Sequence, residues 1–280
     1  MPGSGRSGLT EPEGWRLKKT EHNLLGKRIR MINILILSAG TRDKVVQYFK
    51  EALAGKGKVI ATDCSPYAPA IYEADEYVLV PRITEPGYLD KILEICREKQ
   101  ITGVLSLIDP ELSLLADNKE RFLEVGTVPI VPDAKQVDIC FHKYAMYEAC
   151  KALGFATGRC FLDRKEFYHA VENGELTYPV FVKPESGSAS LDIHMAQDQE
   201  TVEFLCSRED GLMIQEFMNG QEYGADVYID MLSGEVISIF VKKKLKMRAG
   251  ETDKAESFQE EKLFALITDF VKKMGFRGII

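Results

Sequence analysis

Long apolar runs, paired cysteines and an excess of basic residues are all missing from this 280-residue sequence. No apolar run approaches the roughly 18 residues that a membrane-spanning helix requires. The six cysteines form no CxxC pair and no zinc-like spacing, which favours a reduced, cytoplasmic protein. The formal net charge of −7 argues against general nucleic-acid binding, because phosphate backbones bind to basic surfaces. These absences point away from membrane proteins, disulfide-rich secreted proteins and nucleic-acid binders.

Two phosphate-binding fingerprints are missing from the expected strand-to-helix turns. The turn after the first expected strand reads SAGTRD, residues 38–43, and lacks the GxGxxG pattern of dinucleotide sites. The Walker pattern GxxxxGK[ST] is also absent. Asp63 ends the second expected strand, where it could bind a ribose, as in a dehydrogenase, or serve as a cap or turn residue. The four histidines show no triad spacing, and no side-chain nucleophile is evident.

Expected strands and helices alternate from Met31 to about Pro132. This alternation predicts a parallel sheet covered on both faces, and therefore a Rossmann-like domain. Residues 1–30 are glycine-rich and then charged, and we expect a disordered extension that contributes nothing to the fold. The expected strands are 32–40, 58–63, 76–81, 101–109 and 127–132, and the expected helices are 42–54, 87–100 and 110–124.

The pattern changes after Pro132 to an α+β arrangement with antiparallel strand pairs. One helix is expected over 137–155, and two strands, 178–184 and 191–197, are expected around a Ser/Gly loop. The other expected strands are 158–162, 212–218, a hairpin of 221–230 and 235–245, and the start of a strand at 277–280. The other expected helices are 164–174, 198–210 and 257–276.

Two lysines lie where the pattern otherwise places core residues. Lys143 precedes Met146 by three residues on the apolar stripe of the expected helix, and Lys183 ends the apolar strand Val180-Phe181-Val182. Either lysine could extend past the edge of the core. An unpaired charge at such a place is costly, however, and an anionic ligand would remove the cost. The loop ESGSAS that follows, with Ser186, Gly187 and Ser188, offers backbone N–H groups to phosphates without bulky side chains.

Further candidate residues follow the lysines. The segment Gln215, Glu216, Phe217 and Met218 ends a strand, where backbone groups could contact an adenine edge. Glu222 could accept hydrogen bonds from a ribose, or it could be a solvated turn residue. Arg248 is the candidate catalytic residue, as a group that could bind phosphate or carboxylate. Lys242, Lys244 and Lys246 share one strand face, either as ligands or as the charges of an edge strand.

In this order and at this spacing, these elements resemble the ATP-grasp superfamily, and within it relatives of the carbamoyl-phosphate synthase large subunit. The stretches ILILSAG, ATDCSPYAPA and GVLSLIDPELSLLA resemble a pre-ATP-grasp domain, and HKYAMYEACKALGF with YPVFVKPESGSAS resembles the two ATP lysines and the phosphate-covering loop. The resemblance implies a Rossmann-like pre-ATP-grasp domain at 31–132, then an ATP-grasp domain at 133–280 with a lid subdomain at about 155–215. It also implies that Lys143 and Lys183 contact phosphates, that 215–218 hold adenine and that Glu222 holds the ribose.

The resemblance further implies ATP-dependent ligation of a carboxylate to an amine through an acyl phosphate, with Mg²⁺ as cofactor. The family's metal ligands stand in an E-x-N setting after the long helix, whereas this sequence stops at MGFRGII. We therefore expect a chain truncated before its metal-binding strands, with at most trace activity; the alternative is a nucleotide-binding fragment without turnover. The expected partners are ATP and small carboxylate and amine substrates, with a homodimer as a possible assembly and neither nucleic acid nor membrane.

Overall fold

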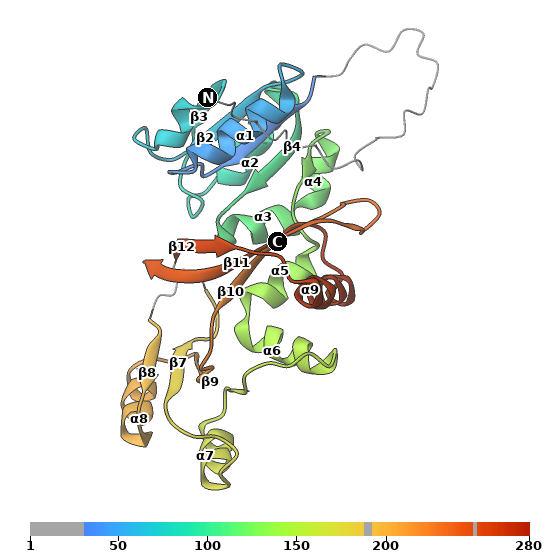
Figure 1. The fold of residues 1–280 in the computed structure, drawn as a ribbon. Helices are drawn as coiled ribbons and strands as arrows, with labels where there is room; N and C mark the ends of the chain where they lie inside the picture. The colour runs from blue at the N-terminus through green and yellow to red at the C-terminus, as the bar shows by residue number, and fades with distance from the viewer. Residues whose placement is uncertain (1–30, 188–191, 249–250) are drawn as a thin grey trace, which may run out of the picture. The chain divides into compact units, whose positions relative to one another are not determined.

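The computed structural model describes residues 31–187, 192–248 and 251–280 (Figure 1). The predicted disorder of residues 1–30 concerns a segment outside the described residues, as does the role predicted for Ser188. The Ser/Gly loop after β7 is described as far as Gly187. Among the helices that the described residues form, none has both the length and the apolarity needed to cross a membrane.

The first half of the described chain is a five-stranded parallel sheet with helices on both faces (Figure 1). Alternate residues of the first strand enter two separate cores, Leu35 with the second and third helices and Ile36 with the first. The Rossmann-like prediction is therefore confirmed. In the sheet order β3-β2-β1-β4-β5, the strands are β1 (Asn33–Leu37), β2 (Val59–Asp63), β3 (Glu76–Leu79), β4 (Ile101–Ser106) and β5 (Val128–Pro129). The helices are α1 (Asp43–Leu53), the 3-10 turn η1 (Pro69–Tyr72), α2 (Tyr88–Glu98), α3 (Asp109–Asp117) and α4 (Lys119–Glu124).

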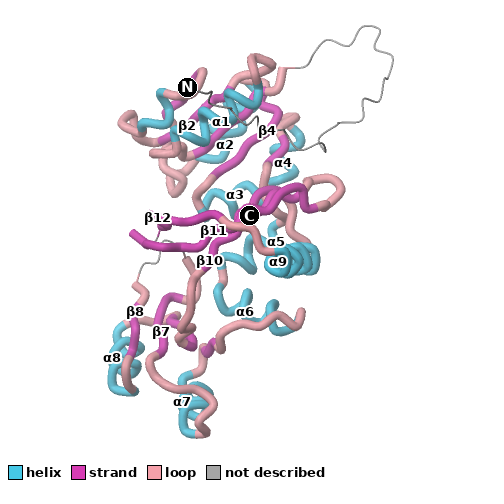
Figure 2. Tube along the Cα trace, in the orientation of Figure 1, coloured by secondary structure: helices cyan, strands magenta, loops and turns pink. Residues whose placement is uncertain are grey.

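The second half contains two antiparallel four-stranded sheets, as the α+β pattern predicts (Figure 2). One sheet lies in the segment expected to form the lid and is called the lid sheet here; it buries Val180 and Val182 against Phe167 and Val202 of its two helices. The other sheet buries Val227 and Ile229 against the last helix. The lid sheet has the order β6 (Cys160–Phe161), β9 (Leu212–Glu216), β7 (Val180–Pro184), β8 (His194–Ala196), with helices α7 (Arg164–Glu172) and α8 (Gln199–Arg208). The second sheet has the order β12 (Glu251–Ser257), β11 (Val236–Arg248), β10 (Tyr223–Ile229), β13 (Gly278–Ile279), with helix α9 (Glu261–Met274).

Two expected helices are broken in the structure. The helix expected over 137–155 is divided into α5 (Ala134–Phe141) and α6 (Lys143–Ala152), because His142 is extended, with φ −99° and ψ 104°. The backbone of His142 instead pairs with Ser186, far away in sequence. The helix expected over 110–124 breaks at Asn118, whose side chain donates to the Leu114 carbonyl. The spacing of apolar side chains does not predict either helix break, because it continues through both positions.

The edge-strand interpretation of the three lysines is wrong. β11, which carries them, lies between β10 and β12, and β12 was not expected from the sequence. Each ammonium has an acidic neighbour on an adjacent strand or turn, so these charges are neutralised within the fold. The pairs are Lys242 with Asp226 at 2.6 Å, Lys244 with Glu222 at 2.5 Å, and Lys246 with Asp253 at 3.5 Å.

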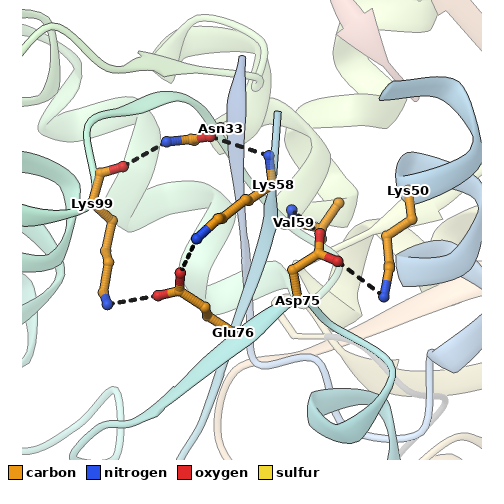
Figure 3. Close-up of polar contacts among 7 residues, drawn as sticks. All are labelled: Asn33, Lys50, Lys58, Val59, Asp75, Glu76 and Lys99. Carbon is orange, nitrogen blue, oxygen red and sulfur yellow. Dashed lines mark hydrogen bonds and ion pairs between the residues drawn. The ribbon is translucent and has the colours of Figure 1, made fainter. Parts of the chain in front are cut away.

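Polar side chains tie together the amino-terminal edge of the parallel sheet (Figure 3). Glu76 accepts hydrogen bonds from Lys58 at 2.6 Å and from Lys99 at 2.7 Å. Asn33, the first residue of β1, donates to the Lys99 carbonyl and accepts from the Lys58 amide, which ties β1 to the residues that precede β4 and β2. The hydrogen bonds from Lys58 and then Lys99 lower the pKa of Glu76 to about 2. The network therefore stabilises the amino-terminal ends of the strands, on the side of the sheet opposite to their carboxyl ends.

We predict that Glu76→Gln lowers the free energy of unfolding at pH 7 by about 1 kcal/mol or less, because the side chain is 31% exposed and the pairs are screened. The folded-state pKa is depressed, so the contribution is present above the ordinary value of 4.5 and is lost as the pH falls toward about 2. Urea unfolding from pH 7 to 3.5 should show the gap between wild type and variant narrowing. Glu98→Gln, on the exposed face of α2, is the control; a gap independent of pH would contradict the prediction.

Candidate functional site

Asp63 holds the turns at the carboxyl ends of β1 and β2. One carboxylate oxygen accepts from the Gly40 amide at 2.9 Å and the other from the Ser65 amide at 2.8 Å. Gly40 has φ +56°, in the left-handed region that glycine adopts easily. Both oxygens of this 8% exposed residue therefore bind backbone within the domain. This arrangement favours the turn interpretation over ribose binding.

A buried carboxylate that sequence reasoning missed lies at the same edge. Glu111, in the first turn of α3, is 0% exposed and accepts from Ser38 Oγ at 2.6 Å and Ser106 Oγ at 2.5 Å. Its third donor is the Tyr88 hydroxyl, and burial, followed by the charge of Glu111, raises the pKa of Tyr88. The bond to Ser38 holds that residue at φ +42°, which L-residues rarely adopt. The sequence signal for this cluster was weak: a serine stands at the carboxyl end of β1 and of β4, and acidic residues occupy the first turn of α3.

Lys143 and Lys183 line one cavity of about 200 Å³, although they come from a helix start and a strand end 40 positions apart. Lys183, on β7, donates to Gln215 Oε1 on β9 at 2.5 Å. Lys143, the first residue of α6, donates to the Gly187 carbonyl at 2.9 Å. The cavity is completed by Cys140, Met146, Tyr147, Thr157, Cys160, Met213 and Gln215.

Burial lowers the pKa of both lysines, in each case as the largest cause. For Lys183, the positive charge of Lys143 lowers the pKa further, whereas Cys160 opposes the shift. For Lys143, the nearby Glu185 carboxylate partly compensates for burial. Two partly desolvated cations that repel each other form an electrostatic environment that an anion would stabilise.

The other predicted residues are more widely distributed. The Glu216 carboxylate accepts from the Arg159 amide, and the Glu216 amide donates to the Arg159 carbonyl. Glu216 and Phe217 line a separate cavity of about 300 Å³. Phe217 packs on Phe181 with ring centroids 5.4 Å apart, and Met218 is largely exposed. Of the segment 215–218, Gln215 is thus the member that lines the lysine cavity.

Glu222 and Arg248 lie on the second sheet. The Glu222 carboxylate is 61% exposed and is paired with Lys244, while Arg248 ends β11 in register with Glu251. Gly187 and Cys140 also line an apolar cavity of about 370 Å³, next to the carboxyl end of β4 and to Phe276. Of the predicted residues, the structure therefore brings together Lys143, Lys183 and Gln215, with Gly187 adjacent; their roles as ligands stay predictions.

Across 31–187, 192–248 and 251–280, no three His, Cys, Asp or Glu side chains are grouped as metal ligands would be.

Two family profiles match the chain. A PylC-like N-terminal domain matches residues 34–131, and an ATP-grasp domain matches residues 140–280. The chain belongs to the ATP-grasp family. The parallel pre-ATP-grasp domain followed by antiparallel ATP-grasp sheets is thereby established as the fold of this ATP-grasp chain. The narrower resemblance to the carbamoyl-phosphate synthase large subunit has no specific support, since the N-terminal match is to PylC-like proteins.

Similar proteins include several ligases and synthetases. A D-alanine–D-alanine ligase of Ruminiclostridium cellulolyticum is 28% identical over 109 residues, which are 33% of this chain and 29% of that protein. The structure of an L-amino acid ligase from Bacillus licheniformis has a TM-score of 0.62 at 17% identity, over 88% of this chain and 61% of that one. N5-carboxyaminoimidazole ribonucleotide synthetase from Thermotoga maritima has a TM-score of 0.64 at 18% identity, over 89% and 63%. At these identities the likeness is one of fold, and the chain spans less than two thirds of each of these proteins.

Proposed function

We propose that the chain binds ATP in the cavity of Lys143, Lys183 and Gln215 and serves ATP-dependent ligation of a small carboxylate to an amine. The observation that carries the proposal is the sharing of one cavity by two partly desolvated ammonium groups from different elements. Nothing local in the sequence drives these cations together, and the triphosphate of ATP has the charge that would stabilise them. Membership of the ATP-grasp family and the ligases among its relatives support the same activity.

The proposed reaction has two steps. An oxygen of the substrate carboxylate attacks the γ-phosphorus, and the bond between the γ-phosphorus and the bridging oxygen of the β-phosphate breaks. ADP departs, and the substrate is now an acyl phosphate. The amine nitrogen then attacks the acyl carbon, loses a proton, and releases inorganic phosphate. Catalysis of such transfers rests on positioning and charge stabilisation, so no side-chain nucleophile is required. Mg²⁺, when bound with the nucleotide, would offset the charge on the phosphates.

In this reaction the residues of the chain bind and orient the nucleotide. The ammonium groups of Lys143 and Lys183 would contact phosphate oxygens, each moving from its present acceptor, the Gly187 carbonyl or Gln215 Oε1. Both lysines are held at defined places, a first helical turn and a paired strand, which limits the entropy lost on binding. The positions proposed for adenine at 215–218, for ribose at Glu222 and for the acidic substrate or phosphate at Arg248 remain parts of this proposal.

Calorimetric titration with ATP and with NAD tests the proposal against a dehydrogenase-like use of the first domain. We expect heat of binding with ATP and none with NAD, because the Asp63 carboxylate is already engaged by the amides of Gly40 and Ser65. Binding of NAD without binding of ATP would contradict the proposal. Incubation with ATP, Mg²⁺ and candidate amino acids, followed by chromatography of ADP, separates ligation from nucleotide binding without turnover.

A further inference from the structure

The junction between α5 and α6 is bound to the chain that follows β7. The Lys143 amide donates to the Glu185 carbonyl at 2.9 Å, and the backbones of His142 and Ser186 form an antiparallel bridge. On its other side, the Glu185 amide donates to the Gly211 carbonyl at 2.9 Å. Glu185 is thus fixed by its backbone between the end of the lid sheet and the first turn of α6.

The side chain of Glu185 strengthens this junction. One carboxylate oxygen lies 2.8 Å from His142 Nδ1, and the other accepts from the Tyr144 amide at 3.3 Å. The side chain is 20% exposed, and His142 itself makes no side-chain capping bond to the helix it precedes. The carboxylate therefore supplies, from 41 positions away in sequence, the acceptor and the negative charge that favour a helix start.

Both lysines of the cavity are attached to this junction. Lys143 is the first residue of α6, and its ammonium reaches back to the Gly187 carbonyl, two residues after Glu185. Lys183 lies two residues before Glu185, on β7. A shift of the junction would therefore change the distance between the two ammonium groups.

We propose that Glu185 is a positioning residue of the nucleotide site, which holds the first turn of α6 against the end of β7 so that Lys143 and Lys183 face the same anion. This inference rests on the ATP site proposed above, and it adds a residue that does not itself touch the nucleotide.

The charges around His142 give the junction a pH dependence. The hydrogen bond to Glu185 is the largest cause that raises the pKa of His142; its partial burial opposes this, Asp138 raises the pKa further and Lys143 lowers it. The Asp138 carboxylate lies 3.7 Å from His142 Nε2. Because the folded-state pKa is raised, the stabilisation by the pair is complete below the ordinary value of 6.5 and is lost as the pH rises through the higher folded value.

The test compares ATP affinity of the full chain and its Glu185→Gln variant by calorimetry at pH 6 and pH 8. The glutamine can still accept from the Tyr144 amide but cannot pair with a charged imidazole. We expect Glu185→Gln to weaken ATP binding by about threefold to tenfold at pH 6 and by less at pH 8. Protonation of the ATP phosphates affects the wild type and the variant equally, so the ratio of their Kd values reports only the effect of the Glu185 side chain. Histidine NMR should show the pKa of His142 returning toward its ordinary value, with His142→Gln used to assign the signal.

Two controls define the outcome. Asp90→Asn breaks a comparable 2.7 Å pair with Arg121 in the first domain, and it should leave ATP affinity unchanged at both pH values. In a Lys143→Met background, Glu185→Gln should have little further effect, because the carboxylate acts through that lysine. Equal ATP affinity of wild type and Glu185→Gln at both pH values would overturn the positioning role, as would full additivity with Lys143→Met.

Failure of the ATP site is distinguishable from failure of this inference. If Lys183→Met weakens ATP binding while Glu185→Gln does not, the site stands and the positioning role is wrong. If the wild-type chain does not bind ATP at all, both proposals are overturned. A circular-dichroism melting curve for each variant shows whether a loss of affinity reflects loss of the fold.

Discussion

Lys183→Met is expected to weaken ATP binding by about 1.5–3 kcal/mol, roughly tenfold to more than a hundredfold in Kd, the range for loss of a charge-assisted hydrogen bond. Methionine keeps an unbranched side chain of similar length on β7 but removes the charge. Burial already lowers the pKa of this lysine, so the folded chain bears a desolvation cost that the substitution relieves. We therefore expect the free energy of unfolding to change little while the affinity falls.

The measurement is calorimetric titration with ATP at constant ionic strength, accompanied by urea unfolding of the same preparations. Lys91→Met is the matched control, since Lys91 lies on α2, far along the chain, and pairs locally with Glu94. An unchanged ATP affinity in Lys183→Met, or an equal loss in Lys91→Met, would remove the assignment of the cavity as a phosphate site.

Glu111→Ala is expected to cost about 3 kcal/mol or more of unfolding free energy, the largest stability effect predicted for this chain. The substitution leaves the hydroxyl groups of Ser38, Ser106 and Tyr88 without their shared buried acceptor and opens space in the core of the first domain. Ser38 would also lose the bond that holds it in the left-handed region. Equilibrium urea unfolding measures the loss.

Ser38→Ala should cost clearly less than Glu111→Ala, because it removes one donor and leaves two for the same carboxylate. Glu98→Ala, at an exposed position of α2, should change stability by only a few tenths of a kcal/mol. A loss below about 1 kcal/mol in Glu111→Ala would mean that the three hydroxyl groups find other partners, and the structural role assigned to the carboxylate would be wrong.

The sequence by itself determined the class of fold and most of its elements. The central strands β1 and β2 are buried on both faces, as expected for a parallel sheet covered by helices, and α1 buries Val46 with Val45, Phe49 and Leu53 around it. These patterns depend on residues close together in sequence, since a period of two or 3.6 is local information. Lys183 could likewise be predicted as a ligand-binding candidate from local sequence, because it ends an apolar strand just before a loop of small residues.

Only the tertiary structure decided which distant groups meet. The break at His142 depends on Glu185 and Ser186, which lie just after β7, whereas the side-chain pattern of a helix continues through His142. In the sequence, Glu111 is an ordinary acidic residue of a first helical turn; only the fold places the serines at the ends of β1 and β4 against its carboxylate. The lysine cavity has the same origin, because the separation of 40 positions between Lys143 and Lys183 carries no local preference. Such contacts form because each partner belongs to an element held by its own core, and the free energy that brings the elements together comes from burial elsewhere.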